Sequence, residues 1–289
     1  MKMRFKVLAA VAGMSALGAA TAWQASAAET IPLSKVSHIH GIAVDRTDPR
    51  RLFLATHHGV FLTNPDGTAT RVSDGRHDYM GFTPDPEDPR TFYASGHPVT
   101  GGNLGFLVST DGARTWTQVS LGANGPVDFH AMDASPADPK VLYGLYGGIQ
   151  ASRNGGKTWE ATGKPPADTF DLAASARDPD TVYAATREGV MISRDAGETW
   201  QAGSMVQRPA TMVETTDDGT VYAFQAGAGL LKTTEPSLAW QRVNNGFGEA
   251  VLLHLAADPK NSERLFAVTE KSQVLASQDG GKTWSPFQS

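Results

Sequence analysis

Histidine is concentrated in one part of this chain. Seven of the eight histidines lie between His38 and His130 of a 289-residue sequence. The sequence contains no cysteine, and a methionine, Met80, falls within the same stretch. Imidazole and thioether groups together are ligands for copper, and imidazole also binds zinc and nickel. These residue types indicate a metal ion, provided that the fold brings them together.

A repeat of about 42 residues must position these side chains. Tryptophans follow one another at intervals of 43, 41, 40 and 44 residues, at Trp116, Trp159, Trp200, Trp240 and Trp284. Asp-Pro pairs recur with them, and the residues between the turns are of strand-forming types. This period, with four short strands in each repeat, is typical of a β-propeller. The expected fold class is all-β, a six-bladed β-propeller.

Four repeats end in a short motif before tryptophan, close to Ser-x-Asp-x-Gly-x-Thr-Trp. The copies are Ser109–Trp116, Ser152–Trp159, Ser193–Trp200 and Ser277–Trp284. The motif resembles the Asp-box, or BNR, repeat of a superfamily that includes sialidases, the sortilin ectodomain and a photosystem II assembly propeller. That resemblance implies that the boxes form hairpins at the rim of each blade. We therefore expect the box carboxylates to be structural, namely Asp111, Asp195 and Asp279.

Alignment of the repeats on the Asp-Pro turn predicts where the histidines meet. The position nine residues before the proline is His40, Met80 or His130 in the first three repeats, and the second strand ends near His57 or His97. These two strands are antiparallel neighbours, so the start of one lies beside the end of the other, on one face of the disc. The predicted metal ligands are His38, His40, His57, Met80, His97 and His130.

The distribution of these residues favours a site over a scaffold role. If histidine were needed to build a blade, all six repeats would carry it, yet the fourth repeat has Phe170 at the matched position. Asp78 and Asp128 lie near the same face and could bind the metal or hold an imidazole N–H. A surface histidine is more often an ordinary polar residue than a ligand. That interpretation stays open for the others, and we expect Met132 to lie in the core.

The first residues predict a signal peptide. Three basic residues precede an apolar run that ends near Ala22, and a small-residue cleavage pattern follows at 25–27. The expected division is a signal peptide, 1–27, and one propeller domain, 28–289. Without those three basic residues, 22 Lys and Arg stand against 30 Asp and Glu. We expect an acidic, periplasmic or secreted protein, a monomer that binds no nucleic acid and does not insert into the membrane after cleavage.

Three functions are open at this point. The first is a non-enzymatic propeller that binds a metal ion, copper or alternatively zinc, for sequestration or delivery, with a periplasmic protein as a possible partner. The second is a protein-binding scaffold without a metal. The third is a sialidase-like glycoside hydrolase, which the Asp-box resemblance implies. Sialidases use an arginine cluster and an acidic pair, and although Asp78, Asp128 and Asp168 lie near one face, no arginine cluster accompanies them. We assign no catalytic residue.

Overall fold

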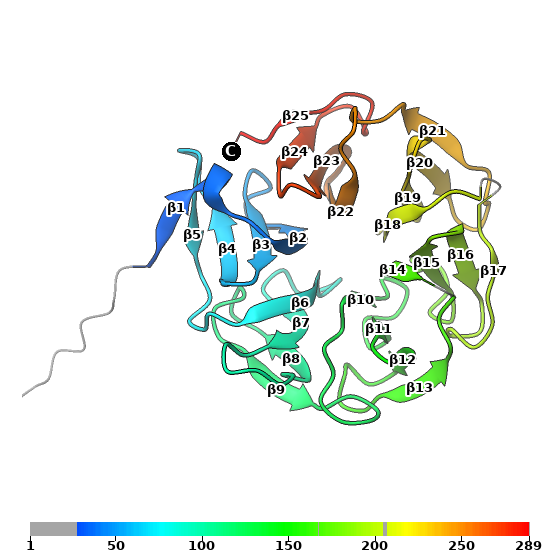
Figure 1. Cartoon of the computed structure of the whole chain (residues 1–289), viewed down its shortest axis with the longest axis horizontal. Coiled ribbons are helices and arrows are strands. Elements are labelled where there is room, and N and C mark those ends of the chain that lie inside the picture. The colour runs from blue at the N-terminus through cyan, green and yellow to red at the C-terminus, as the bar shows by residue number, and fades with distance from the viewer. Residues whose placement is uncertain (1–27, 167, 205–206, 289) are drawn as a thin grey trace, which may run out of the picture.

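Six antiparallel sheets are arranged around a central axis in the computed structural model of this protein (Figure 1). The structure describes residues 28–166, 168–204 and 207–288, so the predicted signal peptide lies outside the described residues. Within these ranges, the one helical element is a 3-10 turn, η1 (Leu33–Lys35). No helix of the described part is long and apolar enough to cross a bilayer. The predicted all-β, six-bladed propeller is confirmed.

Each blade is built from strands that are consecutive in the chain and pair as antiparallel neighbours. Blades 1 to 3 contain β1 (Thr30–Pro32), β2 (Ile39–Val44), β3 (Leu52–Thr56), β4 (Gly59–Thr63), β5 (Thr68–Arg71), β6 (Asp78–Pro84), β7 (Phe92–His97), β8 (Phe106–Ser109), β9 (Thr117–Ser120), β10 (Ala131–Ala134), β11 (Leu142–Leu145), β12 (Ile149–Ser152) and β13 (Glu160–Gly163).

Blades 4 to 6 repeat this order, and the first strand of every repeat lies nearest the central axis (Figure 1). They contain β14 (Thr169–Ala174), β15 (Val182–Thr186), β16 (Gly189–Ser193), β17 (Gln201–Ala202), β18 (Ala210–Thr215), β19 (Thr220–Gln225), β20 (Gly229–Thr234), β21 (Gln241–Asn244), β22 (Leu252–Asp258), β23 (Asn261–Thr269), β24 (Val274–Ser277) and β25 (Ser285–Pro286).

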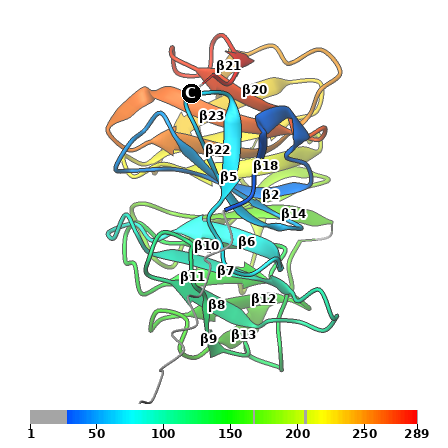
Figure 2. The ribbon, with the colours of Figure 1, turned by 90° about the vertical axis from the view of Figure 1, so that its left-hand side faces the viewer.

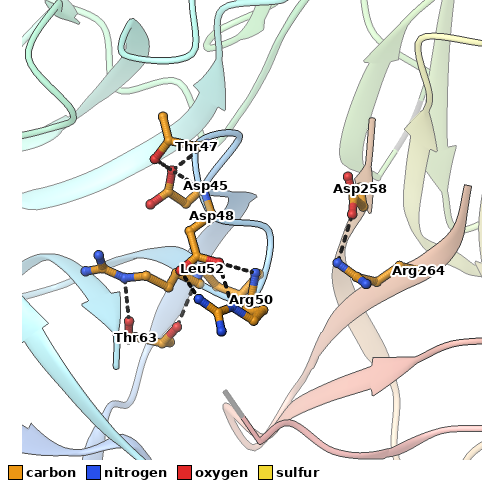
Figure 3. A network of polar contacts seen from close by, with 9 residues as sticks. Asp45, Thr47, Asp48, Arg50, Leu52, Thr63, Asp258 and Arg264 are labelled. Atoms are coloured by element: carbon orange, nitrogen blue, oxygen red, sulfur yellow. Dashed lines mark hydrogen bonds and ion pairs between the residues drawn. The ribbon is translucent and has the colours of Figure 1, made fainter. Parts of the chain in front are cut away.

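The Asp-Pro pairs form the turns that connect the first and second strands. Asp48 Oδ1 accepts the backbone N–H of Arg50 at 3.2 Å and the side-chain Nε–H of the same residue at 2.9 Å (Figure 3). In blade 6, Asp258 accepts the backbone N–H of Lys260 at 2.9 Å and pairs with Arg264 at 3.2 Å. An aspartate that binds an N–H two residues on closes a tight turn. The repeated turn therefore sets where each inner strand ends.

In the four repeats that carry an Asp box, the box forms the hairpin between the third and fourth strands of the blade. In the box of blade 4, Asp195 Oδ1 accepts the backbone N–H of Thr199 at 2.9 Å, and Ser193 Oγ accepts that of Gly197 at 2.8 Å. The indole N–H of Trp200 donates to the carbonyl oxygen of Gly197 at 3.2 Å. These contacts satisfy backbone groups within the hairpin. The structural role predicted for the box carboxylates is confirmed.

The core consists of side chains packed between neighbouring blades. Met132 packs in one such cluster with Phe129 and Trp159, which confirms its predicted place in the core. Another cluster joins blade 1 to blade 6 through residues such as Leu52 and Phe266.

A short strand, β1, precedes the first repeat. It pairs with β5 at the outer edge of blade 1, the edge that faces the viewer in Figure 2. Blade 6 is formed by residues 252–286 without β1. The ring therefore closes by packing of blade 1 against blade 6 and not by a shared sheet.

Candidate metal-binding site

The backbone delivers two histidines of blade 1 to the same end of the blade. Ile39 pairs with Thr56 across β2 and β3, so His40 and His57 lie beside each other where β2 begins and β3 ends. The register shifts between Ile39 and Gly41, which leaves His40 in a β-bulge. A bulge redirects the side chain of the extra residue. The ring centroids of His40 and His57 are 4.4 Å apart as a result.

Asp78 of the next blade completes a three-residue cluster, hereafter the first cluster. The Nδ1 atom of His57 lies 2.5 Å from Asp78 Oδ2, and Nε2 of His40 lies 3.6 Å from Asp78 Oδ1. One ligand atom from each residue lies within 4.8 Å of the others. The ring of His38 adds a further imidazole, 4.8 Å from that of His57. Blade 1 therefore contributes imidazole nitrogens and blade 2 a carboxylate oxygen to the same cluster.

The electrostatics of the first cluster leave His40 in the neutral form that can bind a metal ion. Burial lowers the pKa of His40 from 6.5 to about 4, and although the charge of Asp78 opposes this, His57 and His38 reinforce it. His40 is therefore neutral near pH 7 and has a free nitrogen lone pair. Its Nε2 and the Oδ1 of Asp78 are both buried, and neither has a hydrogen-bond partner. Unpaired buried polar atoms cost about 1–3 kcal/mol each, which a bound cation would offset.

A second group, hereafter the second cluster, lies between blades 2 and 3. The Nε2 atoms of His97 and His130 lie 3.2 Å and 2.9 Å from the same oxygen, Oδ2 of Asp128. The hydrogen bond to Asp128 raises the pKa of His130. Asp128 is only 2% exposed, whereas the side chain of His130 is 62% exposed. Four of the six residues predicted as one ligand set are thus divided between two carboxylates, His40 and His57 with Asp78 and His97 and His130 with Asp128.

The other predicted positions fall in distinct places. Met80 is buried and lies two residues after Asp78 on β6, hence on the same side of that strand. Its role as a ligand stays a prediction. His77 lines a separate groove with Tyr79 and Trp116 on the side of blade 2.

The cluster pattern stops after blade 3. Asp168 occupies the position in blade 4 that matches Asp78 and Asp128, but it forms an ion pair with Arg187 at 3.0 Å. The neighbouring Phe170 replaces the histidine and is 49% exposed. Because the scaffold is the same in blade 4 while the ligand types are absent, the histidines are not required to build a blade. This difference supports the site interpretation.

A central cavity of about 160 Å³ lies next to the first cluster. His40 and His254 line it, together with the acidic side chains Asp133, Asp171 and Glu214. Burial lowers the pKa of His254 to about 4, with a smaller effect from His40. The sequence alone does not distinguish His254 from an ordinary polar residue. His254 falls within the expected inner strand of the sixth repeat, three residues after Val251. That position is the feature of the sequence that indicates a place near the central axis.

The acidic residues of the central cavity were missed by sequence reasoning. Burial raises the pKa of Asp133 to about 6 and that of Asp171 to about 8, and it raises the pKa of Glu214 well above the ordinary value. Asp133 Oδ2 accepts the backbone N–H of Ala174 at 2.8 Å, and Asp171 Oδ2 accepts that of Val213 at 3.1 Å. Each bond joins the inner strand of one blade to that of the next. These two carboxylates therefore connect neighbouring inner strands.

The chemistry available to the first cluster is cation binding. Two imidazoles and a carboxylate form a ligand set that zinc, copper and non-haem iron(II) all accept. Asp78 can present Oδ1 to the cation while Oδ2 accepts the Nδ1–H of His57. A carboxylate that orients a ligating imidazole in this way is a common feature of metal sites.

The fold and its boxes define a BNR-type β-propeller. Residues 90–288 match the model of the family described as Photosynthesis system II assembly factor YCF48, and the chain belongs to that family. The solved structure of YCF48 bound to D1 peptide superposes with a TM-score of 0.53 and 19% identity, over 91% of this chain and 85% of that one.

Xyloglucanases are also similar to this chain. The oligoxyloglucan-reducing end-specific xyloglucanase of Emericella nidulans is 25% identical over 93% of this chain, which spans only 37% of that protein. The GH74 enzyme of Niastella koreensis superposes with a TM-score of 0.61 and 18% identity, over 86% of this chain and 45% of that one. At these identities, the solved structures show a shared fold.

Proposed function

We propose that this protein is an exported, non-enzymatic β-propeller that binds a transition-metal ion, most readily copper, through the first cluster. One observation carries the proposal: Nε2 of His40 and Oδ1 of Asp78 face each other at 3.6 Å, buried and without hydrogen-bond partners. His57 and His38 add imidazoles at the same point. Copper is preferred over zinc because Met80 supplies a thioether on the strand of Asp78.

Sequestration or delivery is the role that fits this geometry. His57 is 41% exposed, so a cation at the first cluster can be reached from solvent or by a partner protein. An exported chain without cysteine must handle copper through histidine and methionine, since exposed thiols oxidise in such compartments. We place the protein in the periplasm or outside the cell on the basis of its predicted signal peptide.

A metal titration tests this proposal. Copper(I), copper(II), zinc and iron(II) each compete against a chelating indicator, and the melting temperature is read in parallel. We expect copper to bind with a dissociation constant below about 1 μM, equivalent to about −8.2 kcal/mol. His40→Ala should abolish the binding at the first cluster, and His58→Ala is the matched control because His58 is an exposed neighbour outside the cluster. Binding weaker than micromolar for all four ions would refute the proposal.

A protein-binding scaffold is the second candidate. Large apolar side chains are exposed at the face that carries the histidines: Val99, which is 81% exposed, follows β7, Tyr146 follows β11, and Phe170 lies at the start of β14. Exposed apolar groups that cluster on one face indicate protein contact. The YCF48 structure with D1 peptide shows that this propeller family includes a protein that binds a peptide.

The scaffold candidate is tested by covalent capture of partners in an extract of the source cells. Val99→Ser combined with Phe170→Ser should remove a partner that docks on this face, whereas Val119→Ser on the outer strand β9 should not. Capture that is equal in both variants would exclude this face as the docking surface.

Glycoside hydrolysis fits the site less well. Glycosidases need two carboxylates on either side of a substrate cleft. In this chain Asp133 and Asp171 bind backbone amides, and the central cavity of about 160 Å³ is smaller than the roughly 300–1,000 Å³ typical of ligand pockets. We expect no release of reducing ends from xyloglucan oligosaccharides. Release above the blank that disappears in Asp171→Asn would overturn this expectation.

A further inference from the structure

The arrangement of the first cluster is repeated one blade further on. In blade 1, the histidine after the second strand, His57, contacts the carboxylate that begins the inner strand of blade 2, Asp78. In blade 2, the histidine at the end of the second strand, His97, contacts Asp128, which lies just before the inner strand of blade 3. The same backbone positions therefore bring an imidazole to a carboxylate across two successive blade junctions.

The carboxylate of the second cluster has a free oxygen. Oδ2 of Asp128 is within hydrogen-bond distance of His97 and His130, at 3.2 Å and 2.9 Å. Oδ1 of Asp128 is buried and has no hydrogen-bond partner, although the residue is only 2% exposed. A buried carboxylate with an unsatisfied oxygen is costly unless a proton or a cation binds it. Oδ1 of Asp78 in the first cluster is likewise buried and without a hydrogen-bond partner.

The two clusters adjoin. Asp78 and His97 are directly paired across β6 and β7, so the carboxylate of the first cluster lies opposite an imidazole of the second. Directly opposed residues in antiparallel strands have Cβ atoms about 4.5–5.5 Å apart. The ligand groups thus form a continuous row from His40 to His130. The row contains two carboxylates, and each retains one unsatisfied oxygen.

We infer that the second cluster, His97, Asp128 and His130, is a second metal site, so that the face binds two cations side by side. The inference rests on the proposed function, because it assumes that the first cluster binds one. The donors are two imidazole nitrogens and one carboxylate oxygen, a set suited to copper(II) or zinc. Among the described residues only the first cluster already has three ligand atoms within 4.8 Å of one another, so the exposed imidazoles of the second cluster must rotate when the ion binds. Because His130 is 62% exposed, the second ion is the more accessible of the two. It is the position from which a cation would enter or leave the row.

The stoichiometry of binding tests the inference. The purified protein is dialysed against copper(II) alone or zinc alone, and bound metal is counted by elemental analysis. We expect two equivalents for the wild type and one for His97→Ala, with the remaining equivalent retained at the first cluster. His57→Ala should also retain one, the combined variant should retain none, and His58→Ala should keep both. Asp128→Asn should behave as His97→Ala.

The outcomes separate this inference from the proposed function. One equivalent in both the wild type and His97→Ala would overturn the second site and leave the first intact. Loss of all metal in His97→Ala, with the circular dichroism spectrum unchanged, would indicate one shared site and would also overturn the inference. No binding by the wild type would refute the proposed function itself. His97 is half-exposed, so its replacement provides a test even if Asp128→Asn fails to fold.

Discussion

Asparagine in place of Asp171 should make the stability of this protein less dependent on pH. The two carboxylate oxygens of Asp171 accept the backbone N–H groups of Leu172 and Val213 at 3.0 Å and 3.1 Å. Burial, with a smaller effect from the charge of Asp133, raises the pKa of this carboxyl group from 3.8 to about 8. We therefore expect Asp171 to hold a proton at neutral pH in the folded protein and to lose it on unfolding.

The sign and size of the effect follow from proton linkage. Between the unfolded pKa of 3.8 and the folded pKa of about 8, the folded state binds more protons than the unfolded state. The free energy of unfolding must then fall as the pH rises through this window, and it levels off above the folded pKa. Each pH unit is worth about 1.4 kcal/mol, and the proton is half lost near pH 8. The change between about pH 6 and pH 8 is therefore about 2 kcal/mol.

Urea unfolding followed by tryptophan fluorescence, at several pH values between about 6 and 8 and with a chelator present, measures this difference. The wild type should lose about 2 kcal/mol or more, since the pKa of Glu214 in the same cavity is also raised. Asp171→Asn should lose about 2 kcal/mol less. Asp66→Asn is the control, because hydrogen bonds from Thr68 lower the pKa of this exposed carboxyl group. A flat wild-type profile, or equal slopes in wild type and Asp171→Asn, would refute the reasoning.

Three further predictions concern packing, the Asp box and the metal. Gly144→Ala should lower the free energy of unfolding by about 1–3 kcal/mol, because the new Cβ would lie 2.5 Å from Cδ1 of the buried Phe129 ring; an unchanged urea midpoint would contradict it. Ser277→Ala should cost about 1–3 kcal/mol, because Ser277 Oγ accepts the buried N–H of Gly281 at 2.9 Å; the same urea series measures it, and a loss under about 0.5 kcal/mol would count against the box as a stabilising unit. Copper at about 100 times its dissociation constant from the first cluster should stabilise the wild type by about 2.7 kcal/mol through that cluster. A chelator should reverse this effect, and the shift should be smaller by this amount in His40→Ala; an equal thermal shift in that variant would contradict the ligand assignment.

Much of the fold could be predicted because its signals are local. The tryptophan spacing and the Asp boxes repeat with the blade, and each box makes its own hydrogen bonds, as Ser193 and Asp195 do. The Asp-Pro turns gave a common register for the inner strands of the first four repeats. That register was enough to predict that His40 and His57 lie on one face, which their ring contact confirms.

The division of the histidines into two clusters could not be predicted. Asp78 and Asp128 were expected only near the face, and the choice of partner depends on how one blade packs against the next. His40 reaches Asp78 from a β-bulge, which has no clear signal in the sequence. His254 lies next to the first cluster only because blade 6 packs against blade 1. Its imidazole forms a hydrogen bond with the backbone of Ile39 in blade 1.

The sequence alone therefore determined the all-β class, the number of blades and the face that carries the histidines. These features depend on turn chemistry and on side-chain alternation within a single repeat, which residues close in the chain decide. Only the tertiary structure decided which carboxylate each imidazole meets and which acidic side chains are buried at the axis. Those contacts form between blades, where packing and closure of the ring determine the distances between side chains. Burial there shifts the pKa values of these groups and so determines which of them are charged.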